Sequence, residues 1–192
     1  MHIFFLCGKN GIFADKLGFS PALRYTAIIA CQKSAGSGGS DMNILVSACL
    51  LGVACRYDGG AKTDPRAAAL LREHCLVPFC PEVYGGLPTP RLPAELRDGS
   101  VVTQAGTNVT AQYTRGAREA LHLARLCGCT LAILKERSPS CGHGSIHDGS
   151  FTGALTPGDG VTAALLRENG IEVIGESEIE AFFAPGGSGA AL

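Results

Sequence analysis

Residues 42–52 read MNILVSACLLG, and this stretch decides the fold that the sequence predicts. Its first part, 43–47, is a brief apolar run with β-branched residues, which is typical of a strand buried on both faces. Cys49 follows the run almost directly. The sequence therefore predicts a buried strand with a thiol in the loop behind its carboxyl end.

Three more runs of this kind follow, and helical stretches separate them. The predicted strands are 43–47, 76–79, 130–134 and 171–174, and the predicted helices are 64–74, 108–127 and 161–169. Asp64 and Pro65 are a typical helix start, and Gly170 is a typical helix end. Alternating strands and helices imply crossover connections. The predicted fold is α/β, a small three-layer Rossmann-like domain with a mainly parallel sheet of about four strands.

The chain of 192 residues is long enough for one well-buried domain. Residues 42–184 are predicted to form it. Residues 1–41 show little periodicity and end near SAGSGGS, a composition typical of flexible coil, so we interpret them as a disordered extension or a misassigned start. The tail 185–192, PGGSGAAL, is predicted to be flexible.

Charge and hydropathy exclude several classes of partner. The formal net charge is −1, and Lys and Arg form no cluster, so the sequence predicts no binding to a nucleic-acid polymer or to an anionic membrane. No apolar run reaches the roughly 20 residues needed to span a bilayer, and the opening MHIFFLCG lacks the basic start of a secretory signal. The predicted location is the cytoplasm, where nine cysteines indicate metal binding or catalysis before disulfides.

Three of the cysteines follow predicted strands. Cys49 follows the first strand, Cys80 the second, and Cys141 lies in the loop RSPSCGHG after the third. The carboxyl ends of parallel strands meet at one edge of a sheet, which is where ligands bind in such folds. We therefore expect these thiols to meet there as metal ligands.

The other cysteines are expected to have different roles. Cys75, Cys127 and Cys129 precede strands, so we expect them at the opposite edge or in the core as small buried apolar groups. Cys55 lies in the loop ACRYDGG near the ligand edge, and its role is left open. Cys7 and Cys31 belong to the predicted extension.

Two types of metal centre fit three thiolates. A zinc site with an open position is one, although the usual short CxxC spacing is missing. An iron-sulfur cluster is the other, since it accepts ligands from distant segments and leaves one iron open when only three are supplied. Glu82 is a candidate general acid or base, and Ser138 a candidate hydrogen-bonding group for a substrate ring.

Two further groups are candidates for secondary roles. The polar loop that follows Cys49 is a candidate for substrate binding, and its residues are Cys55, Arg56, Tyr57 and Asp58. An alternative is that Arg56 and Asp58 only pair with each other. His143 and His147 have the spacing of a helical metal pair, but they lie in a Gly-rich loop, so we expect them near the surface or behind the ligands.

The motifs SACLLG with CRYDGG, CPEVYGGLPTPR, LKERSPSCG and GDGVTAALLRENGIEVIGE occur in this order. Together they resemble a bacterial family first known as a domain of unknown function, which includes the thiouracil desulfidases. The resemblance covers about residues 42 to 180. It implies a 4Fe-4S cluster held by Cys49, Cys80 and Cys141, with Glu82 and Ser138 as the catalytic pair.

The implied reaction replaces C=S with C=O in a small thiolated compound, such as a thiouracil-like base or nucleoside, without net redox change. Two alternatives use the same thiolates: a non-catalytic sulfur or metal carrier, and a zinc-dependent hydrolase. The sequence selects neither the substrate, the sulfur acceptor nor the oligomeric state.

Overall fold

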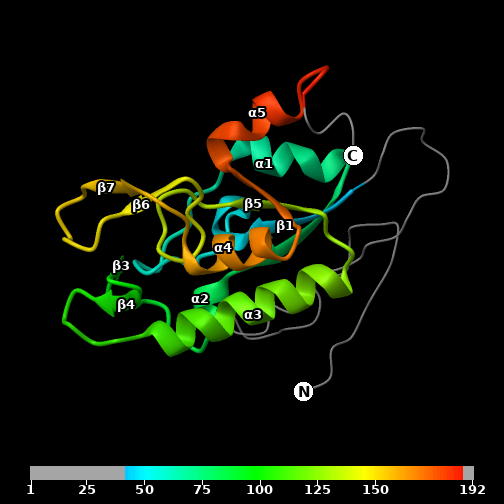
Figure 1. Ribbon diagram of the computed structural model, residues 1–192. Coiled ribbons are helices and arrows are strands. Elements are labelled where there is room, and N and C mark those ends of the chain that lie inside the picture. The colour runs from blue at the N-terminus through cyan, green and yellow to red at the C-terminus, as the bar shows by residue number, and fades with distance from the viewer. Residues whose placement is uncertain (1–41, 188–192) are drawn as a thin grey trace.

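The computed structural model describes residues 42–187, so the predictions for residues 1–41 and 188–192 lie outside the described residues. Its centre is a four-stranded parallel sheet in the order β2, β1, β5, β8 (Figure 1). The strands are β1 (Asn43–Ser47), β2 (Cys75–Phe79), β5 (Leu131–Leu134) and β8 (Glu172–Gly175). All four predicted strands are present, with ends within about one residue of the prediction.

Helices cover both faces of this sheet. One face carries α1 (Pro65–Ala69) and α5 (Ile179–Phe182), and the other carries α3 (Thr110–Leu126) and α4 (Val161–Glu168) (Figure 1). Short helical turns complete the set: η2 (Ala48–Leu51), η3 (Leu70–Arg72), α2 (Pro81–Tyr84) and η4 (Glu176–Glu178). The three-layer α/β prediction is confirmed.

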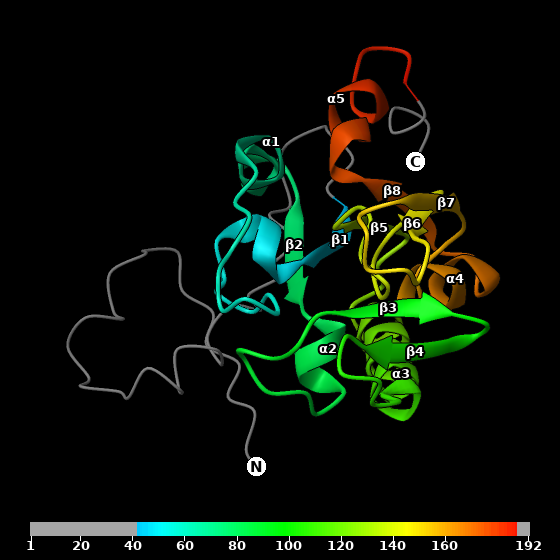
Figure 2. The same ribbon diagram turned by 90° about the vertical axis from the view of Figure 1, so that its left-hand side faces the viewer.

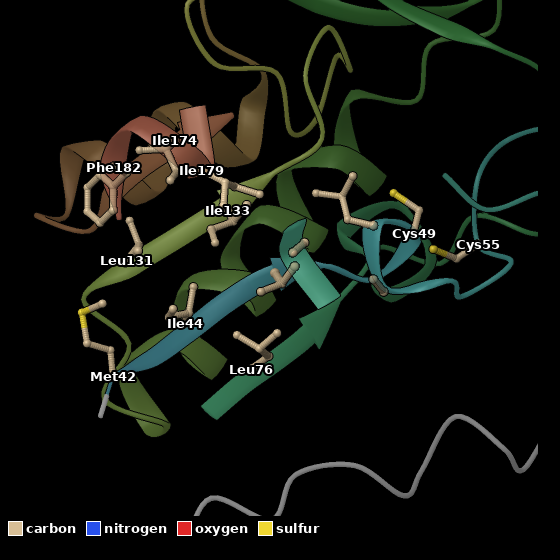
Figure 3. Close-up of a cluster of buried hydrophobic side chains, with 14 residues drawn as sticks. Met42, Ile44, Cys49, Cys55, Leu76, Leu131, Ile133, Ile174, Ile179 and Phe182 are labelled. Atoms are coloured by element: carbon tan, nitrogen blue, oxygen red, sulfur yellow. The ribbon is translucent and has the colours of Figure 1, made fainter. Parts of the chain in front are cut away.

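Burial on both faces explains why the strands are almost wholly apolar. Ile44 and Val46 of β1 belong to one apolar cluster, with Phe182 of α5 (Figure 3). Leu45 points to the other face, where it belongs to a second cluster with Ala120 of α3 and other residues. Side chains alternate between the faces of a strand, so a strand covered on both sides needs apolar residues at every position.

The first predicted helix begins as expected and ends early. Asp64 Oδ1 accepts the Arg66 backbone N–H at 2.8 Å, and Pro65 occupies the first turn. The α-helix ends at Ala69 and continues as η3. Glu73 and His74 both donate to the Leu70 carbonyl, so the last turn is tightened.

Strand β2 lies at an edge of the sheet, since within residues 42–187 it pairs with β1 alone. It contains Pro78, which stands opposite Val46 and has no backbone N–H. An edge strand tolerates proline when the side that would carry the N–H faces away from the neighbouring strand. Pro78 therefore leaves the pairing with β1 intact.

Two glycines hold α2 closely against α3. A Cβ at Gly116 would lie 1.9 Å from the Pro81 carbonyl oxygen. A Cβ at Gly85 would lie 2.1 Å from the Gln112 carbonyl oxygen. No other residue permits backbones to approach so closely. This contact fixes α2 immediately behind the carboxyl end of β2.

Two β-hairpins were not predicted. They pair β3 (Ala94–Arg97) with β4 (Ser100–Thr103) and β6 (Ser145–His147) with β7 (Leu155–Pro157). The hairpins lie side by side, with β3 in contact with β6 (Figure 2). None of the helices in residues 42–187 is both long enough and apolar enough to cross a bilayer.

Candidate functional site

A cavity of about 380 Å³ lies at the carboxyl edge of the parallel sheet. Residues that follow β1, β2 and β5 line it, as do residues of both hairpins. Cys49, Cys80 and Cys141 are all among the lining residues. The prediction that these thiols meet at one edge of the sheet agrees with this arrangement, because each strand delivers its cysteine to the same cavity.

Local structure fixes each of the three cysteines. Cys49 lies on η2 directly after β1, and Cys80 is the N-cap residue of α2 directly after β2. Cys141 follows a tight turn in which Ser138 Oγ accepts the backbone N–H groups of Ser140, at 3.1 Å, and of Cys141, at 3.2 Å. Cys49 and Cys80 are therefore held at strand ends, and Cys141 is held by a hydrogen-bonded turn.

Cys55, whose role the sequence left open, also lines this cavity. It is 1% exposed and lies beside Cys49 (Figure 3). Hydrogen bonding with the Cys55 thiol lowers the pKa of both Cys49 and Cys80, and the same contacts raise the pKa of Cys55 itself. Burial raises the pKa of Cys141. Two of the three predicted ligands therefore lose their protons more readily than an ordinary thiol does.

Glu82 lies in the first turn of α2 and lines the cavity. Its Oε2 accepts Arg91 Nε at 2.8 Å, and its carboxylate also accepts the Tyr113 hydroxyl. Tyr113 is buried, and burial raises the pKa of its phenol, so it remains a donor. The carboxylate is thereby held in one orientation from two sides.

Arg91 and Tyr113 are functional candidates that the sequence analysis missed. The Arg91 side chain is 6% exposed, and besides Glu82 it binds the Cys55 carbonyl oxygen at 3.0 Å. It therefore ties the carboxylate to the loop that carries Cys55. Arg91 is the last residue of the motif CPEVYGGLPTPR, and this position was the one feature of the sequence that could have indicated a role at the site.

Ser138 lines the cavity, and its hydroxyl oxygen also accepts the two N–H groups of the turn before Cys141. Its position is fixed by close packing, since a Cβ at Gly142 would lie 2.7 Å from the Ser138 carbonyl oxygen. The hydroxyl hydrogen is left available for a ligand, because both hydrogen bonds use the oxygen as acceptor.

The predicted substrate loop is only partly directed at the cavity. Cys55, Arg56 and Tyr57 line it, and Asp58 does not. Arg56 Nη2 pairs with Asp58 Oδ2 at 3.1 Å at the surface, so the simpler reading of Asp58 as a loop-forming residue fits the geometry. The Tyr57 carbonyl accepts the Arg91 backbone N–H at 2.8 Å, which anchors the loop.

The two histidines, His143 and His147, lie in different environments. His143 Nδ1 lies 3.1 Å from Asp159 Oδ1 and so supports the loop around Cys141 from outside, whereas His147 lines the cavity. Lys135, another lining residue, forms an ion pair with Glu176, and its backbone N–H binds Ser47 Oγ at 2.9 Å. Lys135 lowers the pKa of Cys49, after the larger effect of the Cys55 hydrogen bond.

Three cysteine thiols from separate segments fit the ligands of an iron-sulfur cluster. Within residues 42–187, no three Cys, His, Asp or Glu side chains converge as the ligands of one metal ion do. A zinc ion requires all its thiolates within about 2.3 Å of one point. A cubane spreads its ligands over several irons and accepts thiolates from separate segments, such as those of Cys49, Cys80 and Cys141.

The cysteine-lined cavity lies in a part of the chain that matches a known protein family. Residues 44–178 match the family profile described as 2-thiouracil desulfurase. The chain belongs to the 2-thiouracil desulfurase family. This confirms the resemblance found in the sequence motifs, and the matched range includes every lining residue named above.

One relative and one solved structure show the same membership. The uncharacterized protein YbbK of Bacillus subtilis (strain 168) is 43% identical over 146 residues, which are 71% of this chain and 97% of YbbK. The structure of the [4Fe-4S]-dependent thiouracil desulfidase TudS is 50% identical, covers 72% of this chain and 93% of its own, and superposes with a TM-score of 0.69. The α/β fold of this 2-thiouracil desulfurase family member therefore agrees with an existing family structure.

Proposed function

We propose that this protein is a 4Fe-4S-dependent, non-redox desulfidase that converts the C=S group of a small thiolated heterocycle to C=O. Cys49, Cys80 and Cys141 are the proposed ligands. The observation that carries the proposal is the meeting of these three thiols with the Glu82 carboxylate in one cavity. Membership of the 2-thiouracil desulfurase family supports it, as does the similarity to a [4Fe-4S]-dependent thiouracil desulfidase.

The reaction balances without an external oxidant or reductant. The thiocarbonyl compound and one water give the carbonyl compound and hydrogen sulfide, so one C=S bond is lost and one C=O bond forms. When bound, the cluster supplies a soft Lewis-acidic iron with an open position for the substrate's sulfur.

The residues of the chain carry the proton transfers. Glu82 takes a proton from the water that adds at carbon and later returns it. Arg91 and Tyr113 keep the carboxylate in place through the hydrogen bonds described above. Ser138 donates its hydroxyl hydrogen to a ring nitrogen, which orients the ring at the cavity.

The test is anaerobic purification, reconstitution with iron and sulfide, and measurement of metal content and of 2-thiouracil desulfidation. We expect brown protein with about four irons per chain and uracil and sulfide as products. A colourless protein with stoichiometric zinc would contradict the cluster and favour the zinc-dependent hydrolase.

Variants of the cysteines complete the test. Cys49→Ser, Cys80→Ser and Cys141→Ser should each lose iron, whereas Cys127→Ser, beyond the opposite end of the sheet, should keep it. Full iron content in any of the first three variants would refute that residue as a ligand.

A further inference from the structure

The hairpins build a part of the cavity wall that the proposed chemistry does not use. Glu95 of β3, His147 of β6 and Phe151 of the β6–β7 loop all line the cavity. They come from the two hairpins and not from the loops directly after β1 and β2. Within the described residues, these three side chains have no role in holding the cysteines or Glu82, so their presence at the cavity needs another explanation.

His147 has unused hydrogen-bonding capacity. Its Nδ1 is buried, and it is the only buried side-chain nitrogen or oxygen in residues 42–187 that has no hydrogen-bond partner. An unpaired polar atom that is removed from water is costly, and folded proteins retain few of them. The same side chain lines the cavity, so a ligand there lies close to a ring whose Nδ1 has no partner within the described residues.

Phe151 is held in an unfavourable backbone conformation. Its φ is +57°, in the left-handed region that bulky residues rarely adopt. The Phe151 backbone N–H donates to Glu95 Oε2 at 2.9 Å, and Glu95 is buried. Glycine would be the ordinary residue at such a position. An aromatic residue that is kept there despite strain indicates that its side chain is used.

Close packing fixes the two hairpins together at this point. Gly149, at φ +89°, approaches the Leu96 carbonyl so closely that a Cβ would lie 2.9 Å from its oxygen. Together with the bond between Phe151 and Glu95, this contact anchors the β6–β7 loop on β3 (Figure 2). His147 and Phe151 therefore lie on a segment that these two contacts hold against β3.

We infer that His147 and Phe151 form the recognition wall for the substrate ring. The Phe151 ring packs against the flat face of the thiolated heterocycle, and a His147 ring nitrogen hydrogen-bonds to a polar edge of the heterocycle away from the reacting sulfur. Glu95 is a positioning residue that holds Phe151. This inference rests on the proposed function, because it takes the ligand to be a planar thiolated heterocycle. Stacking and one oriented hydrogen bond are what such a ring offers for recognition.

The test uses the cluster-loaded protein with two probes, 2-thiouracil for turnover and uracil for calorimetric binding. His147→Leu and Phe151→Gly should each raise KM for 2-thiouracil and weaken uracil binding by about tenfold, with unchanged iron content. His122→Leu, at an exposed site on α3, is the matched control and should behave as wild type.

Phe151→Gly also separates a binding role from a structural one. Glycine relieves the left-handed strain, so this variant should unfold near the wild-type temperature while it binds uracil more weakly. Wild-type affinity in both variants would overturn the inference alone. Wild-type protein that carries its irons but leaves 2-thiouracil intact would instead overturn the proposed function.

Discussion

Replacement of Arg91 by methionine should destabilise the protein through Glu82. The substitution keeps the apolar stem and removes the guanidinium, whose Nε lies 2.8 Å from the Glu82 carboxylate. Both side chains are largely buried, at 6% exposed for Arg91 and 15% for Glu82. Removal of one partner of a buried ion pair costs about 3–5 kcal/mol. Glu82 keeps the Tyr113 hydroxyl and some contact with water, so we expect the lower value, about 3 kcal/mol.

A double-mutant cycle assigns this loss to the pair. Glu82→Gln is neutral and needs no counter-ion, so Arg91→Met combined with Glu82→Gln should recover about 2 kcal/mol of the free energy of unfolding. Urea denaturation of the four proteins measures the cycle, and Arg118→Met, on the exposed face of α3, should change stability by less than about 0.5 kcal/mol. If Arg91→Met were as stable as wild type, or if the two effects were simply additive, the account of Glu82 as a carboxylate held by Arg91 would be refuted.

Three further outcomes are expected. Glu82→Gln should lower kcat by about 10²-fold or more with iron content unchanged; sulfur transfer at the wild-type rate would favour the carrier alternative. Gly116→Ala should destabilise the protein by about 3 kcal/mol in thermal denaturation, because its Cβ would strike the α2 backbone, whereas Glu119→Ala on the exposed face of the same helix should not. Hydrogen bonds with Arg66 hold the pKa of Asp64 below its ordinary value of 3.8 against the opposing effect of burial, so the unfolded chain binds this proton more readily. The ionised Asp64 therefore contributes free energy of unfolding above pH 3.8, and this contribution is lost as the pH falls through the folded-state pKa. In urea denaturation at a series of acidic pH values, Asp64→Asn should show a weaker fall in stability over this range than wild type.

The parallel sheet and the cysteine edge could be predicted because both follow from local pattern. Short apolar runs such as 43–47 identify buried strands, and the crossover rule then places every strand's carboxyl end at one edge. Cys49 and Cys80 could be assigned to that edge from their sequence positions alone. Arg91 and Tyr113 could not be found in this way, since their contacts with Glu82 depend on how the loop after α2 and the helix α3 pack in three dimensions.

The hairpins were missed for two different reasons. Between β3 and β4 the sequence contains Asp98–Gly99, both with positive φ, and this dipeptide is a strong two-residue hairpin signal that the strand-helix pattern overshadowed. The strands β6 and β7 are only three residues long and lie in a glycine-rich region, so they carry no detectable alternation. The recognition wall lies on these two hairpins, and His147 was therefore not recognised from sequence as a cavity residue.

Pro78 has a consequence for self-association. An uncovered edge strand offers a row of N–H and C=O groups on which a strand of another molecule can dock, and such docking is a route to aggregation. Pro78 is the fourth of the five residues of β2 and removes one donor from that row, while β2 still pairs with β1 along its length. Within the described residues, a foreign strand that aligned with β2 would lack one hydrogen bond near the carboxyl end of the ladder. Pro78 thus makes this edge a poorer template for strand addition, and Pro78→Val would restore the missing donor.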